Sequence, residues 1–279
     1  DILSYKLNGI AFSAEKANLA KKETHGLDDA EKIVGYPTPA IYSGDASLFV
    51  LRAGVALIQK GLADFLYLSL TDYMQHTYAP EAEASLAFYE QMDEEIGKLV
   101  AAGAIVGATA DHGMNAKVKA NGQPNVLFVE DMLEAEFGSG FRVICPITDP
   151  YVKHHGALGS YVVVHVNDKE KITAVKSWLS LQQGITEVHD KSTATRLLEQ
   201  PEDRTGDLVV MSDRDVVLGR RPQYHDLSAL DGTLRSHGGR YEEMVPLIIS
   251  HPLNATYRMK AWGDPRNFNV FDFTINGTR

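Results

Sequence analysis

The hydrophobic pattern between residues 65 and 113 predicts a strand, a helix and a second strand in succession. Residues 65–71 are mainly leucine and aromatic residues and end at a polar cluster, which is typical of a short buried strand. Between residues 81 and 102, hydrophobic side chains recur every three or four positions, as on an amphipathic helix. Residues 104–110 are small and apolar, as in a parallel strand that is covered on both faces. A unit of this kind places the ends of both strands at the same edge of a sheet, where α/β proteins bind ligands.

Similar patterns predict an α/β fold for the rest of the chain. A helix is expected at residues 46–60, where apolar side chains share one face. Residues 161–211 alternate between strand and helix patterns and can fold as a small α/β unit. We therefore expect a mostly parallel sheet flanked by helices, formed by residues 1–118 and 228–279. A smaller, cap-like α/β domain is expected to be inserted at residues 119–227.

The composition is that of a soluble globular protein, with 44% hydrophobic and 23% charged residues. No apolar run is long enough to cross a membrane, and a net charge of −10 without a basic stripe argues against nucleic acid as a partner. The single cysteine, Cys145, excludes an intrachain disulfide and is expected to be a buried thiol in a cytoplasmic protein. The sequence leaves a homodimer open.

Residue types that bind metal ions follow both strands of the central unit. Asp72 and His76 are four positions apart, so in a helical turn they share a face and can converge on one cation. Asp111 and His112 end the second strand, where Gly113 permits the backbone to turn so that both side chains serve one site. The alternatives are a solvated pair on a helix surface for the first two and a helix-capping Asp beside an incidental His for the others.

A further candidate ligand is His237, which lies in the loop at residues 235–239 between residues that permit a variable backbone. In isolation, a hydrogen-bonded surface histidine is the alternative. His154 and His155 compete with His237, because they follow a turn at Pro150. The remaining histidines have no partner at a ligand spacing and are interpreted as structural or solvated: His25, His165, His189, His225 and His251.

Together, the candidate metal ligands are Asp72, His76, Asp111, His112 and His237. A catalytic zinc ion takes about four ligands and keeps one position open, so five protein ligands indicate two metal ions. Two cations about 4 Å apart can stabilise the attacking and the leaving oxygens of a phosphoryl displacement, and they would offset the negative charge of the chain near an anionic substrate. Asp and His ligands suit Zn²⁺, with Mn²⁺ or Fe²⁺ as alternatives.

At these residues the sequence resembles the alkaline phosphatase superfamily. In that superfamily, a D-x-x-x-H motif after one strand, a D-H-G motif after the next and a late His in a Gly-rich loop bind two zinc ions. Within it, the chain is similar to the phosphonoacetate hydrolase family over most of its length, from about residue 9 to residue 249. The segments that carry the resemblance are residues 71–76, 110–114, 147–152, 154–160 and 234–239.

The resemblance implies that Asp72, His76 and His237 hold one metal ion, and that Asp111 and His112 hold the other. It also implies two further ligands, an Asp and a nucleophilic Thr, which the family places before the region where this chain begins. The implied reaction is hydrolysis of phosphonoacetate, a small anionic organophosphonate, to acetate and phosphate through a covalent phosphoryl-enzyme. We expect an N-terminal portion to be missing, and the chain as given to be inactive without the Thr.

Two alternative functions remain. A nucleotide pyrophosphatase/phosphodiesterase of the same superfamily would share the five ligands and differ in the pocket for the leaving group. A non-catalytic metal-binding protein would keep the ligands without the nucleophile. The sequence does not identify the residues that bind substrate. Lys117 and Lys119 could meet an anion, but we interpret them as part of a solvated loop.

Overall fold

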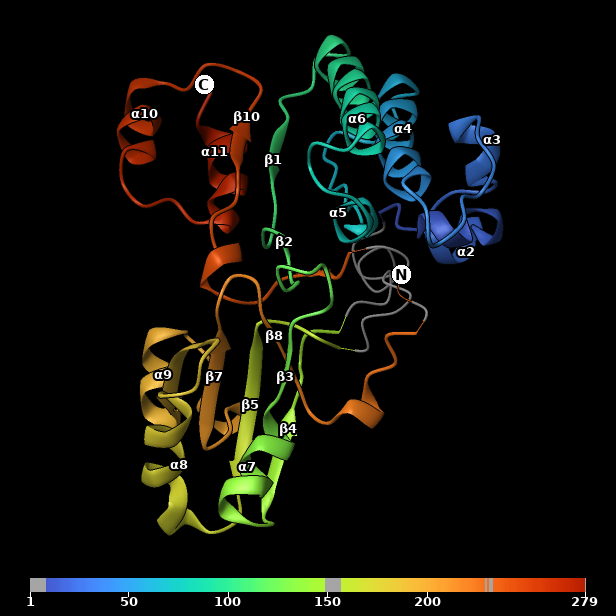
Figure 1. Cartoon of the computed structure of the whole chain (residues 1–279). Helices are drawn as coiled ribbons and strands as arrows, with labels where there is room; N and C mark the ends of the chain where they lie inside the picture. The colour runs from blue at the N-terminus through green and yellow to red at the C-terminus, as the bar shows by residue number, and fades with distance from the viewer. Residues whose placement is uncertain (1–8, 149–156, 229, 231–232, 279) are drawn as a thin grey trace. The chain divides into compact units, whose positions relative to one another are not determined.

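The chain is an α/β protein that divides into two compact units (Figure 1). The first unit consists of Asp1–Ala110 and Pro246–Arg279, and the second unit consists of Asp111–Val245. The computed structural model describes residues 9–148, 157–228, 230 and 233–278. Residues 1–6, whose sequence is typical of the end of a helix, and the competing candidates His154 and His155 lie outside the described residues.

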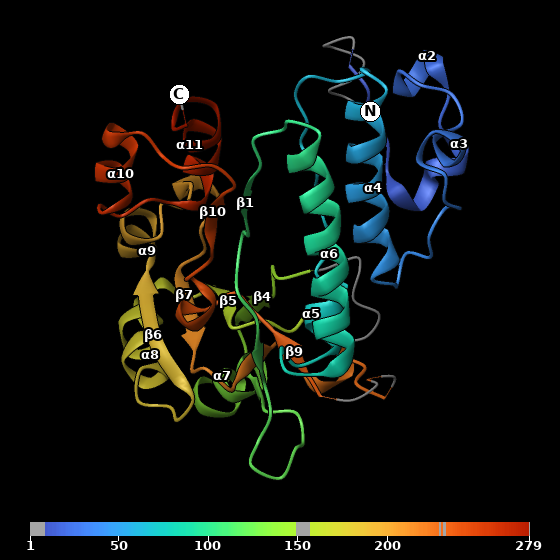
Figure 2. The ribbon, with the colours of Figure 1, turned by 90° about the horizontal axis from the view of Figure 1, so that it is seen from above.

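Two long helices, α4 (Asp45–Gln59) and α6 (Glu83–Ala101), pack side by side in the first unit (Figures 1 and 2). Both helices were predicted from the spacing of their hydrophobic residues, and both predictions are confirmed. Phe49 and Leu57 of α4 belong to the core cluster of this unit. The shorter helical elements are η1 (Ala14–Leu19), α2 (Lys22–His25), α3 (Ala30–Val34), α5 (Tyr73–Thr77), α10 (Ala255–Ala261), η6 (Asn267–Asn269) and α11 (Val270–Asn276).

Residues 65–71 do not form the predicted strand. They pair with no other strand in the described part of the chain, and Thr71 donates its N–H to Ser47 Oγ on α4 instead. Phe65 and Tyr67 are 65% and 71% exposed. The prediction is wrong because an apolar run does not by itself provide a neighbouring strand to pair with, and the aromatic side chains on one face of the segment remain at the surface.

The second predicted strand forms only in part, as β1 (Gly107–Thr109). It pairs antiparallel with β10 (Leu247–Ile249), and α11 packs against both strands. The expectation of a parallel strand at residues 104–110 is therefore wrong for β1, because its partner among the described strands runs antiparallel to it. A small, apolar sequence shows that a strand is covered, but it does not show which strand is its neighbour or in which direction that neighbour runs.

The second unit is built on a four-stranded antiparallel sheet in the order β4-β5-β7-β6 (Figure 1). Val162 and Val164 of β5 face a core formed with α7 and α8, whereas Val163 packs with Ala194 of α9. The helices therefore cover both faces of the sheet. The strands of this sheet and the helices around it are α7 (Val129–Phe137), β4 (Phe141–Ile144), β5 (Tyr161–Val166), η2 (Lys169–Lys171), α8 (Ile172–Leu179), β6 (Ile185–Asp190), α9 (Lys191–Leu197), η3 (Glu202–Arg204) and β7 (Leu208–Ser212). The alternating pattern predicted at residues 161–211 is confirmed.

Two short strand pairs complete the second unit. β3 (Val126–Phe128) runs parallel to β8 (Val217–Gly219), and β2 (Asn115–Ala116) pairs antiparallel with β9 (Arg235–Ser236). Because β2 pairs with β9, the domain boundaries expected after residues 118 and 227 both fall inside this unit. The unit also contains the short helices η4 (Pro222–Tyr224) and η5 (Arg240–Glu242).

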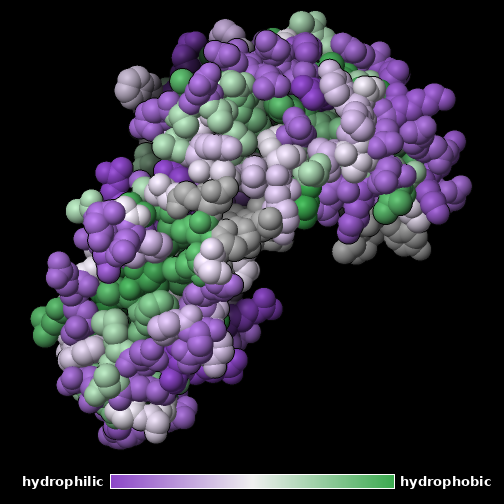
Figure 3. All heavy atoms as spheres, turned by 45° about the vertical axis from the view of Figure 1, so that its right-hand side comes forward, coloured by the Kyte–Doolittle hydropathy of each residue, from purple (hydrophilic) through white to green (hydrophobic). Residues whose placement is uncertain are grey.

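The surfaces of the two units are mixed. Hydrophilic side chains cover most of the face shown in Figure 3, and hydrophobic patches interrupt them on both units. Among the described helices, none combines the length and the apolar character that a membrane crossing requires.

Candidate metal centre

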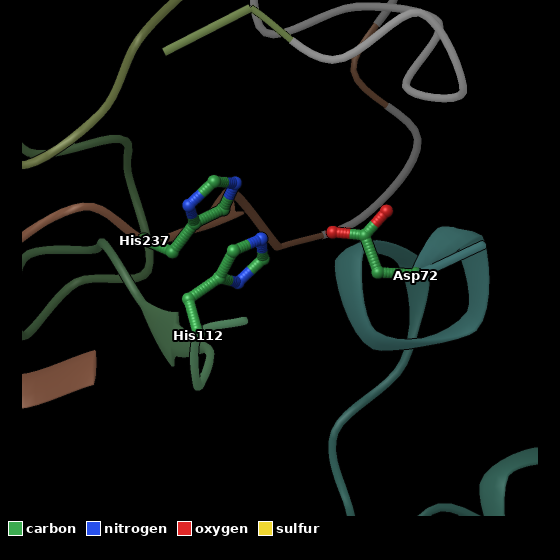
Figure 4. Close-up of side chains that lie close together, drawn as sticks. All are labelled: Asp72, His112 and His237. Atoms are coloured by element: carbon green, nitrogen blue, oxygen red, sulfur yellow. The ribbon is translucent and has the colours of Figure 1, made fainter. Parts of the chain in front are cut away.

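The first unit carries a carboxylate and an imidazole at the start of α5. Asp72, labelled in Figure 4, directly precedes the helix, and His76 lies one turn later. Asp72 Oδ2 is 3.0 Å from His76 Nε2, and the His76 side chain is buried. The carboxylate of Asp72 makes no side-chain capping bond to the helix. The spacing of four residues therefore brings together two metal-ligand types on one face, as the sequence predicted.

The second unit carries two stacked imidazoles. The rings of His112 and His237 lie parallel, with an interplanar angle of 3° and 3.5 Å between their centroids (Figure 4). His112 lies shortly before β2, and His237 directly follows β9. Antiparallel pairing places Asn115 opposite Ser236, so the residues before β2 and after β9 become neighbours. The pairing of these two strands thus explains why two histidines far apart in the sequence meet.

Asp111 lies beside this pair but faces solvent. Its Oδ1 is 3.6 Å from His112 Nε2, and its side chain is 87% exposed. A carboxylate in this position could bind a cation together with the neighbouring imidazole.

The backbone around His237 is fixed on both sides. Ser160 donates its N–H to the carbonyl of His237 at 2.8 Å, and Ser236 Oγ donates to the carbonyl of Leu158 at 2.6 Å. Gly238 has a φ of +102°, in the left-handed region that favours glycine, and a Cβ there would lie 2.9 Å from Ile147 Cδ1. The loop therefore depends on a glycine directly after the histidine.

A buried ion pair that was not predicted from the sequence lies next to the two histidine loops. Lys117 Nζ is 2.9 Å from Glu242 Oε1, and their side chains are 0% and 1% exposed. Burial lowers the pKa of the Lys117 ammonium group, and the hydrogen bond to Glu242 opposes that shift. The interpretation of Lys117 as part of a solvated loop is wrong. Asn115 and Lys117 are two positions apart, so on an extended segment their side chains point to the same face, and both contact Glu242. This spacing was the signal in the sequence that could have placed Lys117 inside the fold.

Two of the other histidines and the cysteine make contacts within the fold that are typical of structural residues. His225 is buried, and its Nε2 accepts the N–H of Arg220 at 2.8 Å. His189 Nε2 lies 2.6 Å from Glu187 Oε2. Cys145 is half-buried against the sheet core, and burial raises the pKa of its thiol to about 11. These contacts agree with the structural interpretation of the three residues.

Comparison with known proteins places the chain in a family. Residues 63–240 match the family model described as type I phosphodiesterase / nucleotide pyrophosphatase. The chain belongs to this family. The matched range contains all five candidate ligands, on both units of the chain.

The chain is also similar to phosphonoacetate hydrolase from Sinorhizobium meliloti 1021, in crystal structures with phosphonoformate and with phosphonoacetate. In both comparisons the identity is 41% and the TM-score is 0.86, over 96% of this chain and 64% of that protein. The chain therefore spans less than two thirds of the length of this relative. Murine ectonucleotide pyrophosphatase / phosphodiesterase 5 is 18% identical, with a TM-score of 0.49, over 78% of this chain and 56% of that protein.

These comparisons confirm the resemblance to the phosphonoacetate hydrolase family and its α/β fold. The residue types at the centre also fit a divalent metal ion of the zinc class, because carboxylate oxygens and imidazole nitrogens are its usual ligands alongside thiolates. The first unit offers one such carboxylate–imidazole pair, and the second unit offers a stacked imidazole pair with Asp111 beside it.

Proposed function

We propose that this chain supplies five ligands to a site for two zinc ions in a phosphonoacetate hydrolase. The observation that carries the proposal is the 41% identity to the Sinorhizobium meliloti enzyme over 96% of the chain. The ligands are Asp72, His76, Asp111, His112 and His237.

The proposed assignment of ligands to the two zinc ions follows the resemblance. Asp72, His76 and His237 hold one ion, and Asp111 and His112 hold the other, with further ligands for the second ion from outside this set. The short distance between Asp72 and His76 supports the first assignment, because the two can bind one cation without rearrangement. Asp111 and His112 are adjacent in the loop before β2, which supports the second.

The proposed substrate explains why a chain with a net charge of −10 would need metal ions. Phosphonoacetate carries a phosphonate and a carboxylate, so an acidic protein repels it unless local positive charge is supplied. When bound, zinc ions supply Lewis-acid stabilisation of the charge on the phosphoryl oxygens. Over the whole hydrolysis the C–P bond breaks, and one water molecule supplies a proton to the methylene carbon of acetate and the oxygen of the new P–O bond of phosphate.

The nucleophilic Thr that the resemblance implies is assigned to no residue of this chain. We therefore propose that the 279-residue chain alone binds zinc but releases no phosphate. Zinc-dependent release of phosphate from phosphonoacetate by this polypeptide would contradict that statement.

The full gene product tests the proposed function. After removal of metal and reloading with Zn²⁺, it should release phosphate from phosphonoacetate, and the variant His237→Ala should lose this activity. His251→Ala is the matched control, because His251 contacts Ser250 and belongs to no proposed ligand set.

A second candidate function is hydrolysis of phosphodiesters, which the name of the matched family favours. The same preparation should therefore be assayed with a nitrophenyl phosphodiester. Faster turnover of the phosphodiester than of phosphonoacetate would favour a nucleotide pyrophosphatase/phosphodiesterase and overturn the hydrolase proposal.

A further inference from the structure

Glu242 contacts the backbone next to both histidines of the stacked pair. Its carbonyl oxygen accepts the N–H of Gly113, the residue after His112, at 2.7 Å. Its carboxylate Oε2 accepts the N–H of Gly239, two residues after His237, at 3.0 Å. One buried residue therefore connects the two loops that carry the imidazoles.

Lys117 and Asn115 hold the carboxylate of Glu242 in place. Lys117 Nζ donates to Glu242 Oε1 at 2.9 Å, and Asn115 Nδ2 donates to the same oxygen at 2.6 Å. A carboxylate that is 1% exposed is costly to bury without an opposite charge, and the same holds for the fully buried ammonium group. Lys117 and Glu242 therefore depend on each other.

Lys117 also reaches the histidine loop by a second route. Its Nζ donates to Ser160 Oγ at 2.7 Å, and the backbone N–H of Ser160 donates to the carbonyl of His237 at 2.8 Å. The ion pair is thus linked to the backbone at His237, at Gly239 and at Gly113. These three positions lie in the two loops that carry the His112 and His237 rings.

We infer that Lys117 and Glu242 are positioning residues that hold the imidazoles of His112 and His237 face to face. The inference deepens the proposed function, since it assigns the residues that would prearrange two of the proposed zinc ligands. Residues behind a metal ligand commonly orient it in this way. An ion pair that served stability alone would leave the geometry of the rings unchanged when it is replaced.

The test compares Glu242→Gln with a matched control, Glu130→Gln. The Glu130 side chain is also 1% exposed and is paired with Arg220 and Arg221, with distances of 2.8 and 2.6 Å to their Nε atoms. Its remaining hydrogen bond comes from the N–H of Val143, outside the histidine loops. Both variants break a buried ion pair. Only Glu242→Gln changes the group that accepts hydrogen bonds from Lys117 and from the Gly239 N–H, because a glutamine amide has a single acceptor oxygen and cannot accept at both of its terminal atoms.

The first readout is the NMR spectrum of the metal-free 279-residue chain. Stacked rings shield each other's protons, so the imidazole resonances of His112 and His237 report the arrangement directly. We expect both sets of resonances to shift in E242Q and to stay unchanged in E130Q. Unchanged resonances in E242Q, or equal shifts in the two variants, would overturn the inference.

The second readout is zinc affinity, measured by competition with a chromophoric chelator. We expect E242Q to bind Zn²⁺ roughly 10–100-fold more weakly than the unmodified chain, and E130Q to bind it equally well. Equal affinity in E242Q would count against the inference. If the unmodified chain binds no zinc, the proposed function fails, while the NMR readout still decides the positioning role.

A second variant covers the case in which E242Q does not fold. The double substitution Lys117→Met with Glu242→Met removes both charges, and such replacements of buried pairs are often tolerated. The positioning role predicts shifted His112 and His237 resonances in this folded variant. Resonances like those of the unmodified chain would overturn it.

Discussion

The imidazoles of His112 and His237 stack with 3.5 Å between their centroids, although they come from the first and last parts of the second unit. The antiparallel pairing of β2 with β9 causes this meeting. The buried ion pair between Lys117 and Glu242 then lies directly behind both loops. The histidine pair is thus a product of strand pairing, and its neighbouring backbone is hydrogen-bonded at several points.

Gly238→Ala should weaken zinc binding and lower stability. A Cβ at this left-handed position would lie 2.9 Å from Ile147 Cδ1, so the Ile147 side chain or the loop of His237 must shift, and the backbone conformation itself becomes strained. The matched control is Gly122→Ala, where φ is +82° and a Cβ would meet nothing within 4 Å. The control should lose about 1–2 kcal/mol of unfolding free energy from backbone strain alone and keep its zinc affinity. Urea unfolding and zinc titration of both variants measure the two effects, and equal zinc affinities would contradict the prediction.

Asp72→Asn should lower by one the number of zinc ions that the chain retains. The substitution removes the charged oxygen that lies 3.0 Å from His76 Nε2 and leaves the side-chain volume nearly unchanged. Metal analysis of the dialysed protein measures the stoichiometry. Asp93→Asn, on the exposed face of α6, is the control and should bind zinc as the unmodified chain does. A stoichiometry that does not change in Asp72→Asn would remove this residue from the ligand set.

Asp190 should contribute to stability in a manner that depends on pH. Its carboxylate pairs with Lys176 and accepts the N–H of Thr193 at the start of α9, and the hydrogen bond from Lys176 is the main reason why its pKa lies well below the usual range. A carboxyl group with a lowered folded pKa stabilises the protein above its unfolded pKa of about 3.9, and that contribution is lost as the pH falls through the folded pKa.

Asp190→Ala should therefore cost about 0.5–2 kcal/mol of unfolding free energy at pH 7. The difference from the unmodified chain should shrink below about pH 4, where the carboxylate of the unfolded chain becomes protonated. Urea unfolding at a series of pH values measures this. A difference that stays constant down to about pH 2 would contradict the assigned role of the charge.

The thiol of Cys145 should react slowly in the folded protein. Burial raises its pKa to about 11, so near neutral pH the reactive thiolate is scarcer than in an unfolded chain. We expect a disulfide reagent at pH 7.5 to modify the folded chain roughly 100-fold more slowly than the chain in urea. Comparable rates in the two states would show that the thiol is accessible and ionised. Cys145→Ala gives the background rate.

The sequence by itself determined those elements whose signal is local. Helices α4 and α6 and the strand–helix series at residues 161–211 followed from periodicity, because each buries one face that its own residues define. The pairing of Asp72 with His76 followed in the same way, since one helical turn brings residues four apart together. The D-x-x-x-H and D-H-G motifs also indicated the family from the sequence, and the comparison with known proteins confirms it.

The tertiary structure alone decided which distant segments meet. It left residues 65–71 unpaired among the described strands, joined β1 to β10, and joined β2 to β9. It also buried Lys117, whose local sequence is polar, because Glu242 approaches it from the other end of the second unit. Strand partners and buried charges depend on residues far away along the chain, so no short window of sequence contains them.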